Sequence, residues 1–170
     1  MLVHRRLPLD FDSAALAAEA VAFGADEWID HFVRDNYEGS WQVLPLRGPA
    51  GETHPIRMAY SDPGATDFVD TLFLERTTAL RGAVSRFPCP LGSVRLMKLT
   101  PGSRILEHRD HDLDPVSGCV RIHVPLTSND GVVFKVAGEA VDMQPGECWY
   151  LRLSEAHEVR NDGPTDRVHL

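Results

Sequence analysis

A series of short β-like runs in the second half of this chain limits its fold more than any other feature. After Pro90, runs rich in β-branched and aromatic residues alternate with turns of Gly, Pro, Asn and Asp. The runs are SVRLMKL, SRILEH, CVRIHVPL, GVVFKV, EAVDM, ECWYLRL, HEVRN and DRVHL. Eight short strands at this spacing, with no helical period between them, predict a closed barrel or a two-sheet jelly roll.

The segment before Pro90 is mixed in character. Residues 12–23 (DSAALAAEAVAF) are Ala-rich and end at Gly24, which predicts a helix. Residues 67–86 carry an apolar stripe closed by a proline, which predicts one or two further helices. Short strands are expected at 41–46 and 55–60, joined by a turn-rich segment.

A chain of 170 residues is long enough for one domain with a sizeable core. We therefore expect a single, mainly β domain over residues 1–170, built as a jelly roll with N-terminal helices packed on one sheet. In this scheme residues 1–90 supply helical and strand support and a candidate substrate lid. Residues 91–170 form the jelly-roll core and carry the site.

Composition excludes several classes of function. The formal net charge of −8 argues against a general nucleic-acid binder, which needs a basic face to displace counterions from phosphates. No apolar run approaches the roughly 20 residues that a membrane span needs, and no secretory signal is expected at the N-terminus. Cys89, Cys119 and Cys148 form no C-x-x-C pair and leave an odd thiol, which favours a reducing, cytoplasmic location.

A candidate metal site begins in the segment PGSRILEHRDHD. If residues 104–110 form a strand, His108 and Asp110 project from the same face because they are two residues apart. His157, in a later strand-like run, supplies a third ligand. Two His and one carboxylate on one side of a metal form the facial triad of non-haem Fe(II) oxygenases. The alternative is a surface pair of His108 with Asp110 and a half-buried strand histidine at His157.

Arg167 stands ten residues beyond His157. With a turn at Gly163-Pro164, residues 157–161 and 166–170 are expected to form adjacent antiparallel strands, so that Arg167 lies deeper in the same barrel. A buried Arg is costly unless an anion meets its guanidinium. A dicarboxylate cosubstrate would provide one, with its far carboxylate on the Arg and its 2-oxo acid end on the metal.

Arg121 and His123 alternate on one strand face in RIHVPL and are candidate donors to the same carboxylates. The alternative for Arg121 and Arg167 is an ion pair with an internal Asp or Glu.

Taken together, LTPGSRILEHRD, RIHVPL and GECWYLRLSEAHEVRNDGPTDRVHL resemble the aspartyl/asparaginyl β-hydroxylase family of 2-oxoglutarate-dependent oxygenases. The resemblance covers roughly residues 90–170, with a weaker echo in NYEGSWQVLPLRG. It implies a double-stranded β-helix, as in cupins. It also implies Fe(II), and hydroxylation by O₂ coupled to decarboxylation of 2-oxoglutarate to succinate.

Carried over by motif, the resemblance implies that His108 and His157 bind the metal and that Arg167, Arg121 and His123 contact the cosubstrate. Animal members that hydroxylate peptidyl Asp and Asn lack an acidic residue two places after the first His, whereas similar bacterial hydroxylases of free amino acids have one.

This chain has Asp110 at that place, with Asp112 two residues further on. The expected reaction is thus hydroxylation of a C–H bond of a small amino-acid-like substrate or of an Asp or Asn side chain.

Substrate recognition is expected to involve the segment before the barrel, where Trp41, Arg47, His54 and Arg57 lie. Arg47 or Arg57 would bind a substrate carboxylate bidentately. The expected partner is a small molecule, amino acid or peptide, with neither nucleic acid nor membrane. Two other functions stay open at this point: a cupin-type metalloenzyme that does not use 2-oxoglutarate, and a non-catalytic jelly roll that binds a small molecule.

Overall fold

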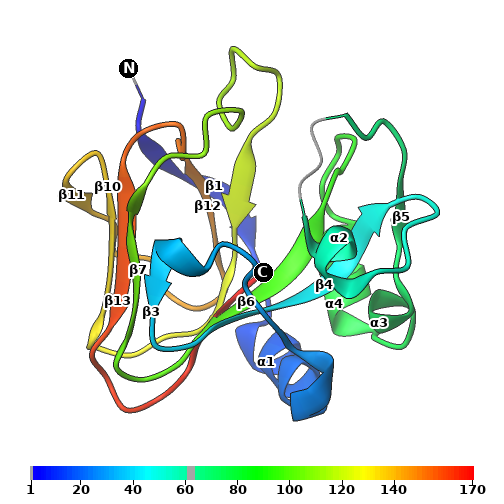
Figure 1. The fold of residues 1–170 in the computed structure, drawn as a ribbon, viewed down its shortest axis with the longest axis horizontal. Coiled ribbons are helices and arrows are strands. Elements are labelled where there is room, and N and C mark those ends of the chain that lie inside the picture. Colours follow the sequence, from blue (N-terminus) through cyan, green and yellow to red (C-terminus); the bar gives the residue numbers. More distant parts are fainter. Residues whose placement is uncertain (1, 61–63) are drawn as a thin grey trace.

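The computed structural model describes residues 2–60 and 64–170, and its strands form three antiparallel sheets (Figure 1). One sheet contains, in order, β1 (His4–Asp10), β12 (Glu147–Leu151) and β8 (Arg121–His123). The second contains β11 (Glu139–Ala140), β10 (Val132–Val136), β13 (His157–Asn161), β7 (Ser103–His108) and β3 (Tyr37–Glu38). The third contains β2 (Ile29–Asp30), β4 (Trp41–Pro49), β6 (Val94–Leu99), β14 (Arg167–His169) and β9 (Pro125–Thr127), and β5 (Phe68–Asp70) pairs with β4.

Short helices cover one side of these sheets. They are α1 (Ser13–Val21), α2 (Pro55–Ala59), α3 (Leu72–Glu75) and α4 (Ala79–Val84), with 3₁₀ turns η1 (Ala25–Glu27) and η2 (Arg34–Asn36). In Figure 1 the sheet that holds β7, β10 and β13 lies on the side away from α2, α3 and α4.

Two apolar clusters form the core. The outer one joins the helices to the sheets and includes Leu16, Leu44, Leu74, Leu80 and Leu96. The inner one draws residues from all three sheets and includes Trp41, Leu99, Phe134, Leu151 and Val159. The sheets therefore enclose a packed interior and bury their inward faces together, which is the construction of a jelly roll.

The predicted fold class is confirmed, because each of the eight runs after Pro90 contains at least one strand. The predicted helix at 12–23 is also present, as α1. The side chain of Asp12 accepts a hydrogen bond from the Ala15 backbone N–H at 3.0 Å, which caps this helix.

In the first 90 residues one local prediction was wrong and another was wrong in part. Residues 55–60 were expected as a strand, but they form the helix α2 because Pro55 occupies its first position, where the fixed φ favours a helix start. Residues 67–86 were expected to form one or two helices; two are present, as α3 and α4, but the start of the segment forms the strand β5. The Thr71 backbone N–H donates to the Leu46 carbonyl oxygen at 2.9 Å, which extends the pairing to β4.

The jelly roll is not confined to residues 91–170. The strand β1, which was not predicted, pairs with β12, and β4 pairs with β6 along most of its length. Without β1 and β4, the backbone groups along one side of β12 and of β6 would lack strand partners. Residues 1–90 are thus part of the sheets as well as their support.

The strands β13 and β14 were expected to be neighbours, and this was also wrong. β13 pairs with β10 and β7, whereas β14 pairs with β6 and β9 in another sheet. The fully buried Asn161 holds the connection at this crossing, since its side-chain amide donates to the backbone oxygens of Leu99 and Thr165, both at 2.9 Å. Arg167 therefore enters the interior from a different sheet than His157.

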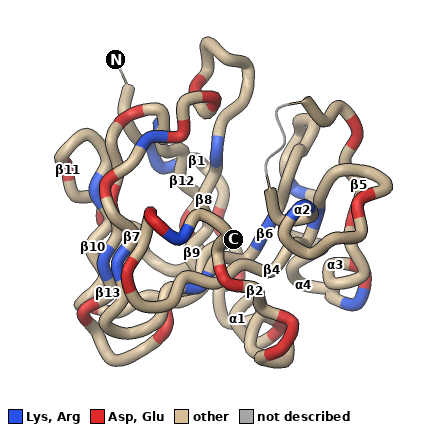
Figure 2. Tube along the Cα trace, viewed as in Figure 1, with Lys and Arg blue, Asp and Glu red and all other residues tan. Residues whose placement is uncertain are grey.

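Acidic and basic residues are interspersed along the described trace (Figure 2). Within residues 2–60 and 64–170, the helices are too short and too polar to cross a membrane.

The side chain of Glu19 on α1 caps the start of α4. Its carboxylate accepts hydrogen bonds from the backbone N–H groups of Thr78, Ala79 and Leu80, each at 2.8 Å. Partial burial raises the pKa of Glu19, but these three bonds outweigh it and the net shift is downward. A depressed folded-state pKa adds stability above the unfolded-state pKa and loses it as the pH falls through the folded-state value.

We expect Glu19→Gln to lower the free energy of unfolding at pH 7 by about 1–3 kcal/mol, because the amide accepts fewer of these bonds. Urea unfolding at pH 7 and near pH 3 measures the effect, and the difference from the wild type should shrink at acid pH. The exposed Glu75→Gln serves as the matched control. Equal stability of Glu19→Gln and Glu75→Gln at pH 7 would contradict the capping role.

Candidate metal centre

The two candidate histidine ligands are cross-strand neighbours. His108 is the last residue of β7 and His157 the first residue of β13, and the two are register partners in the antiparallel ladder. Their ring centroids are 4.2 Å apart. Directly opposed residues on an antiparallel pair are the closest side chains that a sheet offers, so the strand pairing itself brings the imidazoles together.

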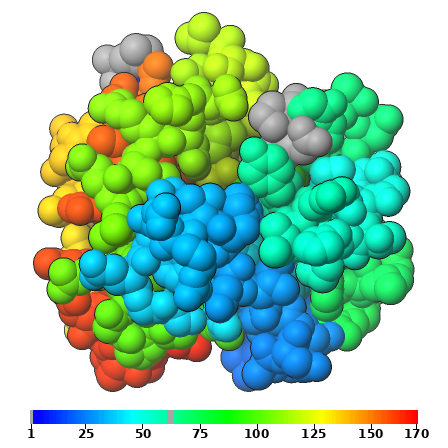
Figure 3. Space-filling model, in the orientation of Figure 1, coloured from blue at the N-terminus to red at the C-terminus, as the bar shows by residue number. Residues whose placement is uncertain are grey.

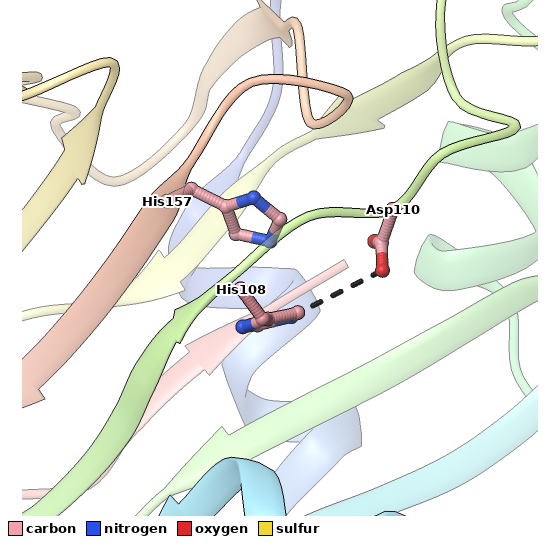
Figure 4. A group of neighbouring side chains, drawn as sticks. All are labelled: His108, Asp110 and His157. Carbon is pink, nitrogen blue, oxygen red and sulfur yellow. Dashed lines mark ion pairs between the residues drawn. The ribbon is translucent and has the colours of Figure 1, made fainter.

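Asp110 completes the group from just beyond the end of β7 (Figure 4). Its backbone N–H donates to the Leu153 carbonyl oxygen at 2.9 Å, which holds this segment beside the chain that leads into β13. The Asp110 Oδ1 atom lies 4.0 Å from the Nε2 atom of His108. The ligand atoms of His108, Asp110 and His157 all lie within 4.8 Å of one another.

Both imidazoles are oriented by the backbone two residues earlier. Nδ1 of His108 lies 2.8 Å from the Leu106 carbonyl oxygen, and Nδ1 of His157 lies 3.1 Å from the Glu155 carbonyl oxygen. A carbonyl oxygen only accepts, so Nδ1 carries the proton in each ring. In the neutral form of each ring Nε2 is then bare, as a metal ligand must be.

Burial keeps His157 neutral. The side chain is only 4% exposed, and burial lowers the pKa of His157 to about 4, with a smaller opposing effect from its bond to the Glu155 carbonyl. Metal binding requires an unprotonated imidazole, so this ring is ready to bind at neutral pH.

Arg121 on β8 binds the remaining oxygen of the carboxylate. Its Nη1 atom lies 2.7 Å from Oδ2 of Asp110. The ion pair turns Oδ1 of Asp110 towards His108, so Arg121 orients the third candidate ligand. Arg95 on β6 lies in the same electrostatic neighbourhood: burial lowers the pKa of Arg95 to about 9, and the nearby Arg121 contributes to the shift.

A second polar group lies on β14 and β8. Arg167 is 2% exposed, and its Nε atom has no hydrogen-bond partner among the described residues. The guanidinium carbon lies 5.5 Å from the Phe134 ring centroid. Nε2 of His123 is likewise buried without a partner. Among residues 2–60 and 64–170, Arg167 forms no ion pair with a carboxylate.

The triad and the polar group around Arg167 suit different ligands: a metal ion and an anionic cosubstrate. Two imidazoles and a carboxylate are donors that ferrous iron takes in a facial triad. A buried guanidinium with an unsatisfied N–H needs an acceptor, and an anion satisfies it best. The residues present therefore fit iron at the triad and the far carboxylate of a dicarboxylate at Arg167.

The aspartyl/asparaginyl β-hydroxylase family model matches residues 13–170. This chain belongs to that family. The match extends well before the segment 90–170 on which the sequence resemblance rested, and it includes α1 and the strands β2 to β5.

A solved structure supports the fold of this β-hydroxylase family member. It is similar to the crystal structure of an oxidoreductase of the 2OG-Fe(II) oxygenase family from Burkholderia pseudomallei, with 16% identity and a TM-score of 0.53. The match covers 98% of this chain and 82% of that one. A predicted oxalate decarboxylase from Thermotoga maritima matches with 13% identity over 99% of this chain and 94% of that one, but at a TM-score of 0.39 it supports no conclusion.

The predicted substrate residues differ in how close they lie to the candidate metal centre. Trp41 is buried, with its ring centroid 6.4 Å from that of His108, and its Nε1 atom is buried without a described partner. It is thus close to the candidate metal centre. The donor groups of Arg47, however, are bound to the Asp70 carboxylate at 2.6 Å and to the Phe68 and Leu91 carbonyl oxygens.

The other two substrate candidates lie near α2. The Nη1 atom of Arg57 lies 3.7 Å from the Glu52 carboxylate, and its side chain is 75% exposed. His54 precedes α2 as its N-cap residue, and its backbone N–H also binds Glu52. The described contacts of His54 and Arg57 are therefore local, and do not include the triad.

Three residues near the site were not predicted. His31 stacks on Trp41 with ring centroids 3.6 Å apart, and burial lowers the pKa of His31 to about 3. Arg95 on β6 and His169 on β14 are the other two. His169 stands two residues after Arg167, so strand alternation could have indicated it. His31 lies between β2 and β3, in a segment whose position cannot be predicted from local sequence. In Figure 3 this segment, coloured light blue, lies across the middle of the face shown.

We expect His157→Ala and Asp110→Ala each to reduce bound Fe(II) from stoichiometric to near zero, because a triad that loses one ligand no longer fixes the ion. Anaerobic equilibrium dialysis followed by metal analysis measures this. Asp112→Ala is the matched control, since Asp112 is an exposed carboxylate two residues beyond Asp110. Loss of iron from Asp112→Ala together with full occupancy in Asp110→Ala would reverse the ligand assignment.

Proposed function

We propose that this chain is an Fe(II)- and 2-oxoglutarate-dependent hydroxylase whose substrate is a small, carboxylate-bearing, amino-acid-like molecule or an Asp or Asn side chain. One observation carries the proposal: an open His108–Asp110–His157 group accompanies a buried, unneutralised Arg167. A metal site alone would suit other cupin-like enzymes. A site that also has a buried guanidinium suits a cosubstrate with an acid group at each end.

In the proposed complex His108, Asp110 and His157 hold the iron. When bound, iron and 2-oxoglutarate supply the oxidising chemistry of this family, in which O₂ hydroxylates a C–H bond while 2-oxoglutarate becomes succinate. The residues of the chain bind the metal and the cosubstrate, orient them, and exclude water from the site. Arg167 and His123 bind the far carboxylate, so the 2-oxo acid end is presented to the metal in one orientation.

Arg121 has a supporting part in this arrangement. The sequence suggested a contact with the cosubstrate, but its ion pair to Oδ2 of Asp110 favours a different role. By holding that oxygen, Arg121 leaves Oδ1 for the metal and keeps the carboxylate from rotating. Oriented outer partners of this kind commonly set metal affinity by about 10–100-fold.

The substrate class is inferred from charge near the triad. Arg121 and Arg95 are both close enough to Asp110 to interact with it electrostatically. A cationic flank beside the iron favours a substrate that carries a carboxylate. The acidic residue two places after the first His agrees with this, because similar hydroxylases of free amino acids share it.

We also propose a cytoplasmic location and no nucleic-acid partner. The three cysteines are unpaired, two of them exposed, which suits a reducing compartment. The net charge of −8 disfavours binding to phosphate backbones.

We expect Arg167→Ala to raise the 2-oxoglutarate concentration needed for half-maximal succinate formation on the order of a hundredfold, through the loss of charge-assisted hydrogen bonds. Iron content should be unchanged, because Arg167 does not belong to the triad. Arg160→Ala is the matched control, since this arginine on β13 is exposed and pairs with Asp162 at 3.3 Å. The measurement is succinate release against 2-oxoglutarate concentration, with metal analysis on the same samples.

Identical 2-oxoglutarate dependence in Arg167→Ala and Arg160→Ala would contradict the role of Arg167 in binding the far carboxylate.

To test the substrate class, free amino acids, their amides and short peptides are titrated against the visible charge-transfer band of the anaerobic Fe(II)–2-oxoglutarate complex. Acids should perturb the band and couple succinate to product, whereas the matching amides should do so more weakly.

A further inference from the structure

The interior holds a histidine to which the proposed function gives no role. His169 is 3% exposed and follows Arg167 by two residues on β14, so both side chains project from the same face of the strand. Its ring centroid lies 5.8 Å from that of His123. A role for His169 in binding the cosubstrate's far carboxylate rests on the proposed function, which assigns that carboxylate to Arg167.

His169 is bonded to the anchor itself. Nη2 of Arg167 lies 2.8 Å from Nδ1 of His169. A guanidinium has only N–H donors, so Nδ1 must be the acceptor, and in the neutral ring the proton is on Nε2. The Phe134 ring lies beneath the guanidinium at 5.5 Å. One edge and one face of the Arg167 head group are therefore fixed before any ligand arrives.

His169 is a neutral hydrogen-bond acceptor for Arg167, and its neutrality favours binding of the cosubstrate's far carboxylate. A carboxylate at this place would fix the guanidinium equally well, but it would neutralise the charge and compete with an incoming acid. An imidazole accepts one hydrogen bond and leaves the positive charge intact. Burial and the adjacent Arg167 both lower the pKa of His169 well below its usual range, so the ring stays neutral.

The remaining donors of Arg167 are left for the ligand. Of the five N–H groups that a guanidinium carries, one is donated to His169, and the buried Nε has no partner among the described residues. A side chain held in place loses less conformational freedom when it binds, which strengthens binding without a new contact to the ligand.

We propose that His169 is a positioning residue for the cosubstrate. It holds the Arg167 guanidinium in the orientation that receives the far carboxylate, and it thereby sets the preference for a 2-oxo acid with a second acid group over one without it.

The test compares the binding of 2-oxoglutarate with that of pyruvate, which has the same 2-oxo acid end but no far carboxylate. Dissociation constants are measured anaerobically on the Fe(II)-loaded protein from the charge-transfer band, without turnover. His169→Leu removes the acceptor. His169→Asn restores one, because the amide oxygen lies close to the place of Nδ1. His4→Gln is a control on a partly exposed histidine of β1.

We expect His169→Leu to weaken 2-oxoglutarate binding roughly tenfold, the effect of losing one hydrogen bond to a charged group. Pyruvate binding should be unchanged, and His169→Asn should recover most of the loss. Thermal melting of each variant verifies that it is folded.

Three results would overturn the assignment. In the first, His169→Leu binds 2-oxoglutarate like the wild type. In the second, it weakens both acids by the same factor, which places the damage at the metal. In the third, His169→Asn is as defective as His169→Leu while melting like the wild type. Failure of the wild type to bind 2-oxoglutarate at all is distinct from these, because it would overturn the proposed function and the inference with it.

Discussion

The candidate site depends on the antiparallel pairing of β7 with β13, which sets His108 opposite His157. The two residues are 49 positions apart in the chain, and only the ladder brings their rings to 4.2 Å. Each ring is then oriented within its own segment, because Nδ1 meets the backbone carbonyl oxygen two residues earlier. Slipping this register by one residue would turn one ring away from the other.

Besides the triad, the interior contains buried polar groups that have no hydrogen-bond partner among the described residues. Arg167 lacks an anionic partner among the described residues, and Nε of Arg167 and Nε2 of His123 lack acceptors or donors. Buried groups of this kind cost stability. Their persistence in an otherwise well-packed interior is typical of a binding site, where local rules for packing are broken in favour of a ligand.

Motif spacing predicted that His108, Asp110 and His157 would lie together and that Arg167 would be buried, and both placements are seen. The predicted strand over 104–110 is shorter than expected, since β7 ends at His108 and Asp110 lies just beyond it. Strand alternation and motif spacing failed for pairings between distant segments. β14 was assigned to β13 as a hairpin, since the Gly163-Pro164 turn suits one, yet Asn161 binds the chain to Leu99 and carries it across to another sheet. α2 was taken for a strand because five residues are too few to show a helical period. His31 and Arg95 reach the site only through tertiary packing.

The charges of the iron, its acidic ligand and the anchor balance those of the cosubstrate in the proposed complex. Iron contributes two positive charges, Asp110 one negative and Arg167 one positive. Burial keeps His123, His157 and His169 neutral, and an imidazole bound to the metal adds no charge. The net result is two positive charges, which the two carboxylates of 2-oxoglutarate balance. A charged His169 or an acidic residue in its place would upset this balance in opposite directions. A neutral acceptor beside Arg167 is therefore what a dianionic cosubstrate requires. Arg121 adds one positive charge that this balance does not include, and that charge favours one further acid group beside the iron.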